Sequence, residues 1–397
     1  MKILWSSNAP WVPSGYGNQT KLTLPRLQGL GHELGLIAWC GLEGAQITME
    51  GVRVYPKGGS PYGVDVLAAH AGHFEADIAI TLIDAWVYKD CVLGTTRWTP
   101  YFPVDSEPIA PQIVEAVRPA YERLIFTRFA EEEMKRVGLS CRYIPHMIDC
   151  TVFKQQATAD ARKKLGFPND VFIAGMVAAN NGFPSRKSYP QALEAFARFH
   201  KRHPDSKLYI HALPFQPGPQ GSINIPTFLA HLSKKYDVSL DQTIMWIPPY
   251  MLNIGIPAEY MRDMYAGLDV LLSPSMGEGF GIPIVEAQAC GTPVIVGDWT
   301  SMSELCFSGW TIAKEQATPF WIPGYETYQY IPDVDAIEEC LEAAYERRGD
   351  QTISDNARSG ALAYDCRTVT ENYWKPVLEE LNERINKGHG ELKLVKF

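Results

Sequence analysis

The sequence predicts an α/β protein of two similar domains, each built on a parallel β-sheet with helices on both faces. Apolar segments typical of buried strands alternate with helix-like segments along most of the chain. The alternation pauses at a linker near residue 150 and then starts again. A length of 397 residues, at roughly 150 residues per domain, and an apolar fraction of 46% leave room for two buried cores. We therefore expect two parallel sheets that face a central cleft.

The expected domains are residues 1–150 and 151–370, followed by a terminal helix, 371–397, that packs back on the first domain. In the first half, the last turn of one helix is marked by Gly31 and that of another by Gly138, because glycine tolerates the left-handed conformation that ends helices. The expected strands there are 2–5, 33–39, 52–55, 76–83, 99–103, 124–126 and 142–149. One expected helix ends near residue 30, and two others span 113–118 and 129–137.

The second half repeats this rhythm. Its expected strands are 171–177, 207–211, 243–247, 268–274 and 293–296, and its expected helices are 190–203, 227–236, 259–266, 336–347 and 353–387. Glycine and prolines within 319–332 predict a loop there. Asp333 precedes a helix, which favours a helix cap over a metal-binding Asp-x-Asp pair.

Composition limits the classes of function. The net charge of −9 disfavours broad nucleic-acid binding, although a local basic patch would escape this count. Eight cysteines without C-x-x-C spacing predict reduced thiols and a cytoplasmic protein. The apolar run at the start is too short for a secretion signal, and no apolar run reaches the roughly 18 residues that a transmembrane helix needs. Without a His or Cys cluster, we expect no metal and no cofactor.

The most informative segment is 273–296. An apolar strand runs into the glycine-rich loop Gly277–Gly281, and Pro283 suits the first turn of the helix that follows. A helix N-terminus behind such a loop binds anions through its backbone N–H groups and its dipole. Glu278 and Glu286 would repel phosphate but accept hydrogen bonds from hydroxyl groups. The segment therefore predicts a site for a diphosphate with polyols on either side, which describes a nucleotide-sugar; the alternative is a loop with surface carboxylates.

Other candidates follow the strands of both halves. Arg186 and Lys187 follow the first strand of the second half and would neutralise a diphosphate, or they are a solvated basic pair. Gly15, Tyr16 and Gly17 would bring backbone amides to the phosphates, or they form a tight turn; this segment lacks the third glycine of a dinucleotide fingerprint.

Polar residues also lie just past strand ends. Asp84 and Asp105, the latter near Glu107, would contact the sugar or an acceptor hydroxyl, or serve as caps and turn residues. His211 ends a strand of the second half, which makes it a candidate for lining the cleft. His146 fits a packed core histidine better than a ligand.

Segment 278–295 resembles the E-x7-E region of family 4 retaining glycosyltransferases. The likeness extends to 259–274, which resembles the family's lead into that motif, to Ser303-Glu304-Leu305, to 143–149 with Phe153, which resembles the interdomain segment, and to Gly31-His-Glu-Leu. The aromatic- and proline-rich opening, 5–17, faintly resembles glycosyltransferases encoded by bacteriophages. The family resemblance implies the GT-B fold, with two Rossmann-like domains.

The resemblance also implies roles for residues. Glu278 would contact the donor sugar, the backbone from Gly279 through Phe280 and Gly281 to Ile282 would hold sugar and phosphates, Glu286 would bind the ribose, and Lys187 would bind the diphosphate. The family usually has an arginine where this chain has Ala179-Asn180-Asn181, and Arg186 would substitute for that arginine. The family's sugar-contacting histidine is absent, and Asp84 or Asp105 lies at a comparable position in the first domain.

These observations predict a metal-independent, retaining transferase that moves a sugar from a nucleoside diphosphate to an acceptor hydroxyl. Domain 151–370 would bind the donor and domain 1–150 the acceptor, which is a protein, glycan, lipid, small molecule or modified nucleobase. An epimerase or phosphorylase of the same fold, or a noncatalytic nucleotide-sugar-binding protein, remains an alternative. An oxidoreductase would need the dinucleotide fingerprint that the sequence lacks.

Overall fold

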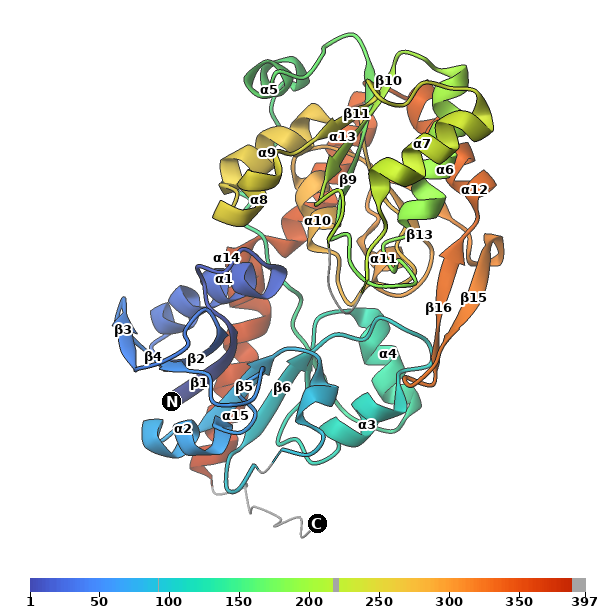
Figure 1. Ribbon diagram of the computed structural model, residues 1–397. Coiled ribbons are helices and arrows are strands. Elements are labelled where there is room, and N and C mark those ends of the chain that lie inside the picture. Colours follow the sequence, from blue (N-terminus) through green and yellow to red (C-terminus); the bar gives the residue numbers. More distant parts are fainter. Residues whose placement is uncertain (92, 217–220, 388–397) are drawn as a thin grey trace. The chain divides into compact units, whose positions relative to one another are not determined.

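The computed structural model describes residues 1–91, 93–216 and 221–387, and the chain divides into two compact units (Figure 1). Unit 1 comprises Met1–Met147, Pro323–Thr327 and the segment from Tyr364 onward, and unit 2 comprises Ile148–Ile322 and Tyr328–Ala363. Residues 388–397 of the predicted terminal helix lie outside the described residues.

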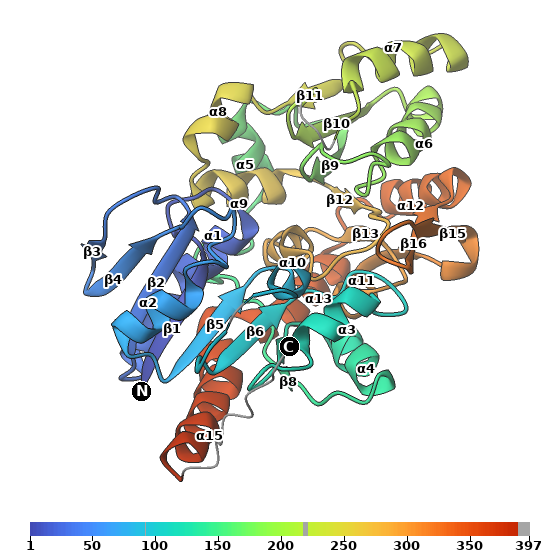
Figure 2. The same cartoon turned by 60° about the horizontal axis from the view of Figure 1, so that its bottom comes forward.

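Unit 1 is built on a sheet whose strands, in the described part of the chain, run in the order β3-β4-β2-β1-β5-β6-β7-β8. Neighbouring strands are parallel except β3 and β4. The central strands β2, β1, β5 and β6 lie side by side (Figure 2) and are almost wholly buried, as continuous apolar runs predict for a parallel sheet. The strands are β1 (Lys2–Asn8), β2 (Glu33–Cys40), β3 (Ile47–Met49), β4 (Val52–Pro56), β5 (Ile78–Leu82), β6 (Trp98–Phe102), β7 (Leu124–Ile125) and β8 (Arg142–Tyr143).

The last helices of the chain complete the core of unit 1. Trp374 is fully buried, and its ring lies 5.9 Å from that of Trp5 and 5.4 Å from that of Tyr101. Arg384 donates a 2.7 Å hydrogen bond to Glu122. The helices of this unit are α1 (Gly15–Gly29), α2 (Leu67–Phe74), the short η1 (Ala85–Tyr88), α3 (Pro111–Val117), α4 (Arg128–Arg136), α14 (Cys366–Val369), the π-helical η4 (Thr370–Trp374) and α15 (Lys375–Asn386).

Unit 2 contains a parallel sheet with the order β11-β10-β9-β12-β13-β14 and, separately, a hairpin of β15 and β16, as far as its described residues show. The strands are β9 (Phe172–Val177), β10 (Ser206–His211), β11 (Ile244–Trp246), β12 (Val270–Ser273), β13 (Val294–Gly297), β14 (Gly309–Ile312), β15 (Ala317–Ile322) and β16 (Thr327–Pro332). The helices are α5 (Thr158–Leu165), α6 (Tyr189–Arg202), α7 (Ile225–Tyr236), α8 (Pro249–Ile254), α9 (Ala258–Gly267), α10 (Ile282–Ala289), α11 (Ser301–Leu305), α12 (Val334–Glu346) and α13 (Gln351–Ala361), with the short η2 (Lys314–Gln316) and, at the boundary, η3 (Leu362–Tyr364).

The structure confirms the expected parallel α/β architecture and corrects one element. The loop predicted over 319–332 is wrong, because these residues form most of the β15–β16 hairpin. Its strands are rich in aromatic and β-branched residues, whose preference for strands outweighs the two prolines. The segment 353–387 is helical as expected, but it is divided into several helices: the chain breaks near Leu362 and a new helix starts at Asp365, which caps it by accepting from Arg367 N at 3.0 Å.

Candidate functional site

The centre of the candidate site is the carboxylate of Glu278, which lies in the loop between β12 and α10. Lys187 Nζ donates a hydrogen bond to its Oε1, Ser275 Oγ donates to the same oxygen at 2.6 Å, and Arg186 NH1 lies 3.4 Å from Oε2. Strands β9 and β12 are parallel neighbours, so the loops that follow them leave the sheet at the same edge. This topology brings together residues that are about 90 positions apart in the chain.

The charge at this point is settled by a balance of opposing effects. Glu278 is buried, and burial alone would raise the pKa of its carboxyl group. The positive charges of Lys187 and Arg186, with the hydrogen bonds from Lys187 and Ser275, overcome burial and lower the pKa of Glu278 to about 2. The carboxylate is therefore ionised at any physiological pH. Together with the two cations it leaves a positive balance that suits an anionic ligand.

Two neighbouring residues, neither of them predicted from the sequence, hold the backbone of this loop. The amide N–H of Glu278 donates to Thr300 Oγ1 at 3.2 Å. Ser301 Oγ lies within hydrogen-bond distance of the carbonyl oxygens of Glu278 and Phe280, at 2.8 and 2.7 Å. Thr300 has a φ of +54°, which is strained for a β-branched residue. The only signal in the sequence was a Thr-Ser pair before a short helix, which is typical of an ordinary helix start.

The helix α10 begins directly after this loop, as expected from Pro283 in its first turn. Gly281 precedes the helix with a φ of +103°, and a Cβ added there would lie 2.7 Å from Ile284 Cδ1. Glycine is therefore required where the backbone turns into the helix. Ile282 is half-buried, whereas the ring of Phe280 is buried in the protein, so Phe280 offers a ligand its backbone rather than its side chain.

Glu286 lies on α10, one turn beyond its start, and it is held differently from Glu278. Tyr265 donates a 2.9 Å hydrogen bond to its Oε2. Burial raises the pKa of Glu286 to about 7, and the hydrogen bond from Tyr265 opposes this only in part. A carboxylate that is costly to ionise gains from hydroxyl donors, because they stabilise its charged form.

His211 lies at the carboxyl end of β10, opposite Val177 of β9. Its Nδ1 is 3.1 Å from Tyr209 Oη, and burial lowers the pKa of His211 to about 4. It is therefore neutral near pH 7 and suited to hydrogen bonding rather than to charge. His146 is a packed histidine, as preferred from the sequence: it stacks on Phe126 at 4.0 Å, and burial lowers its pKa to about 3.

The candidates of unit 1 occupy the carboxyl ends of β1, β5 and β6. Gly15, Tyr16 and Gly17 form the first turn of α1, where Ser14 Oγ accepts from Gly17 N at 3.0 Å. A Cβ on Gly17 would lie 2.2 Å from Val12 O, so close packing alone explains why this residue is a glycine. Asp84 and Asp105 follow the adjacent strands β5 and β6, and their charges both act on Tyr325, a residue of the same unit.

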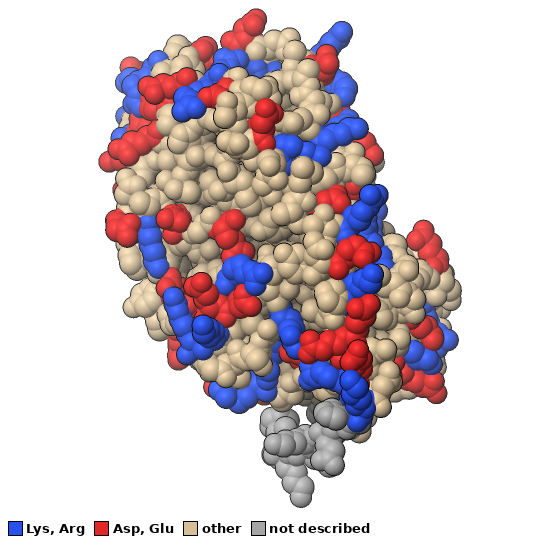
Figure 3. Space-filling model, turned by 180° about the vertical axis from the view of Figure 1, so that it is seen from behind, with Lys and Arg blue, Asp and Glu red and all other residues tan. Residues whose placement is uncertain are grey.

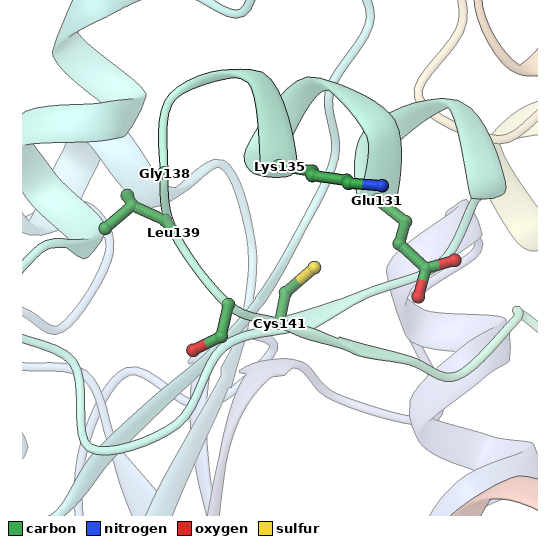
Figure 4. A pocket seen from close by; sticks show the side chains of 6 residues that line it. Glu131, Lys135, Gly138, Leu139 and Cys141 are labelled. Atoms are coloured by element: carbon green, nitrogen blue, oxygen red, sulfur yellow. The ribbon is translucent and has the colours of Figure 1, made fainter.

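The described residues also give information on metal sites, membrane-spanning helices and other pockets. The described residues hold no group of three His, Cys, Asp or Glu side chains placed to bind a metal ion, and no described helix is long and apolar enough to cross a membrane. Asp333 caps α12, accepting from Asp335 N and Ala336 N. A shallow pocket of unit 1, lined by Glu131, Lys135, Gly138, Leu139, Ser140 and Cys141, presents no cationic cluster (Figure 4). On the face shown in Figure 3, basic and acidic side chains are interspersed.

Comparison with known proteins identifies the region around Glu278. Residues 174–321 match the family model described as glycosyl transferases group 1. This region of the chain is therefore similar to group 1 glycosyltransferases. The region contains Arg186, Lys187, Glu278 and Glu286, so the family resemblance inferred from the E-x7-E segment is confirmed. The likeness of the opening segment to phage enzymes stays a prediction.

Curated relatives agree with this assignment. A D-inositol 3-phosphate glycosyltransferase from Corynebacterium kroppenstedtii is 32% identical over 142 residues, which cover 35% of this chain and 28% of the relative. The protein of the same name from Nocardia farcinica is 26% identical over 293 residues, covering 72% of this chain and 60% of the relative. The chain thus spans less than two thirds of the length of these relatives.

Solved structures establish the fold over nearly the whole chain. Sucrose-phosphate synthase from Thermosynechococcus elongatus has a TM-score of 0.72 at 16% identity, with 98% of this chain and 99% of that chain covered. Anabaena Alr3699/HepE in complex with UDP and glucose has a TM-score of 0.64 at 17% identity, covering 96% and 100%. The chain has the GT-B fold expected from the sequence.

Proposed function

We propose that this protein is a retaining, metal-independent glycosyltransferase that uses a nucleoside-diphosphate sugar. The bond between the sugar's anomeric carbon and the diphosphate oxygen breaks, and a bond to the acceptor oxygen forms on the same face of the sugar. The proton of the acceptor hydroxyl passes to the departing diphosphate. No protein nucleophile is required by this scheme, because the leaving group itself acts as the base.

The observation that carries this proposal is the grouping of Lys187 and Arg186 with Glu278 at the start of α10. Negative charge grows on the diphosphate as the sugar departs, and fixed cations beside a helix N-terminus stabilise that charge. Lys187 and Arg186 supply positive charge without a metal ion, which is why we propose metal independence. When a diphosphate engages Lys187, the carboxylate of Glu278 becomes available to hydroxyl groups of the sugar.

The remaining roles follow the chemistry of each side chain. Glu286 binds the ribose hydroxyls, and the backbone of Gly279 to Ile282 meets the phosphates. The solved complexes of Alr3699/HepE contain UDP, glucose or UDP-glucose, so UDP-glucose is the first donor to test. We also propose a cytoplasmic location, and the support for it is that the eight cysteines, all among the described residues, are not joined in disulfides.

The first test is a thermal-shift panel with UDP-glucose, UDP-N-acetylglucosamine and GDP-mannose. A matched donor stabilises the folded protein by mass action, and we expect Lys187→Met to abolish most of this shift. Lys235→Met is the matched control, since Lys235 is an exposed lysine of the same unit that pairs with Glu194. If no donor stabilises the wild-type protein, or if both variants respond as it does, the proposed donor site is wrong.

The second test follows the reaction. Release of nucleoside diphosphate that requires an acceptor, with the anomeric configuration of the product determined by NMR, supports a retaining transferase. We expect the rate to survive EDTA. A product of inverted configuration would contradict retention, and loss of activity that is restored by Mg²⁺ would contradict metal independence.

A further inference from the structure

Unit 1 carries a second cluster of chemically distinctive side chains at the carboxyl edge of its sheet. Strands β2, β1, β5 and β6 are parallel neighbours, so their carboxyl ends share one edge. Trp39 lies near the end of β2, Asp84 and Trp86 follow β5, and Asp105 follows β6. Aromatic and acidic side chains therefore gather where parallel sheets commonly bind their ligands.

The segment Pro323–Thr327 completes this cluster. It belongs to unit 1 and is held there by hydrogen bonds from Gln112 Nε2 to Gly324 O and from Thr327 Oγ1 to Pro108 O. These bonds place the ring of Tyr325 6.1 Å from that of Trp86, at an interplanar angle of 75°.

The carboxylates are close enough to Tyr325 to influence it. Burial raises the pKa of the Tyr325 hydroxyl, and the negative charges of Asp84 and Asp105 raise it further. Tyr325 nevertheless remains 39% exposed, and Trp86 and both aspartates are half-buried. Ordered aromatic rings that stay accessible beside carboxylates are typical of a binding surface rather than of a core.

The chemistry of the cluster selects one class of ligand. A saccharide ring has an apolar C–H face, which packs on the electron-rich face of an aromatic ring, and a rim of hydroxyl groups, which donate to carboxylates. A phosphate group would instead be matched by arginine or lysine. We infer that Trp86 and Tyr325 stack against one neutral saccharide ring of the acceptor, while Asp84 and Asp105 accept hydrogen bonds from its hydroxyls. This inference rests on the proposed transferase function and names its acceptor class.

The test measures binding of simple ring compounds by saturation-transfer NMR on the full chain. The probes are methyl α-D-glucopyranoside, methyl α-D-mannopyranoside, methyl β-D-galactopyranoside and myo-inositol, with glycerol as the acyclic control. We expect transfer to the C–H protons of at least one ring compound and none to glycerol. Inositol and pyranoside arms distinguish a cyclitol from a sugar. Absence of transfer to all four ring compounds would overturn the inference.

Variants locate the binding surface. Tyr325→Ala and Trp86→Ala are each expected to weaken binding by about threefold to tenfold, whereas Tyr325→Phe, which keeps the ring, is expected to bind nearly as well as wild type. Trp321→Ala is the matched control, because Trp321 is an aromatic residue of strand β15 with 44% exposure that lies outside the cluster. Equal binding by wild type and both alanine variants would overturn the assignment.

The outcome is separable from that of the proposed function. Donor stabilisation depends on Lys187, which belongs to unit 2, and is expected to persist in Tyr325→Ala. If donor binding and transfer to a non-saccharide acceptor are found while the ring compounds do not bind, the acceptor inference fails and the transferase stands. If no nucleotide-sugar binds, the proposed function itself fails.

Discussion

Replacing Glu286 by glutamine should stabilise the protein at neutral and higher pH. Burial raises the pKa of Glu286 from an ordinary value of 4.5 to about 7, so the folded protein holds this proton more tightly than the unfolded chain. Stability is therefore lost as pH rises from 4.5 to 7, and the full penalty applies above 7. A difference of about 2.5 pH units, at about 1.4 kcal/mol each, sets the penalty at about 3–4 kcal/mol at most. Glutamine keeps the shape and still accepts from Tyr265, but it carries no charge.

Thermal unfolding at about pH 5 and about pH 8 measures this effect. For a unit of about 200 residues, 1 kcal/mol shifts Tm by about 2–4 °C, so Glu286→Gln is expected to melt up to about 7–14 °C above wild type at pH 8. The difference should fall to about a quarter of this at pH 5. Glu315→Gln, which removes an exposed carboxylate of the same unit, is the control. If Glu286→Gln and wild type differ equally at both pH values, the carboxylate is not costly to ionise and the reasoning fails.

The same carboxylate should make donor binding depend on pH. Ribose hydroxyls that donate to Glu286 favour its ionised form, so binding lowers its pKa and affinity rises with pH through 7. The expected gain between about pH 6 and pH 8 is up to about tenfold. UDP-glucose is the proper probe, since its phosphate groups are diesters that do not titrate in this range. Glu286→Gln should bind more weakly than wild type at pH 8 and show no such rise.

Three further outcomes are expected. Lys187→Met should reduce kcat by about 10²–10³-fold in a transfer assay, with Lys235→Met unchanged, because the cation stabilises the leaving diphosphate. Thr300→Val keeps the shape of the side chain but leaves Glu278 N without its acceptor, so it should lower the unfolding free energy by about 1–3 kcal/mol in urea and lower kcat. Thr300→Ser should restore both. Unchanged stability and kcat in Thr300→Val would contradict the role of Thr300 in holding the loop backbone. Asp333→Ala should lower the unfolding free energy by about 1 kcal/mol without altering donor binding, since Asp333 caps α12; a change in donor binding would point to a second role.

Local chemistry made much of the fold predictable. The cap at Asp333 and the helix start at Pro283 each depend on a few adjacent residues, and the structure has both as expected. The parallel sheets follow from continuous apolar strands separated by helices, which have few other stable arrangements. The hairpin of β15 and β16 was missed because Gly324 and the prolines were weighted above the alternating aromatic residues.

The site was predictable only in part, because its key contacts join distant segments. Lys187 and Glu278 were each candidates, but nothing in the sequence indicates that they pair directly, since that follows from the adjacency of β9 and β12. Thr300 and Ser301 support the loop around Glu278, and this depends on the strained backbone of Thr300, which no local sequence pattern predicts. Tyr325 lay in a segment read as a loop, and its nearness to Asp84 and Trp86 follows from tertiary structure alone.

The dispersed make-up of unit 1 has a consequence for how the protein is made. Its hydrophobic interior closes around Trp374, yet a ribosome delivers that tryptophan only after unit 2 has been synthesised. The lobe that emerges first is therefore finished last, and a gene truncated after codon 147 would encode a fragment with an open interior. Expression trials of this lobe alone should join residues 364–387 behind residues 1–147 through a short linker.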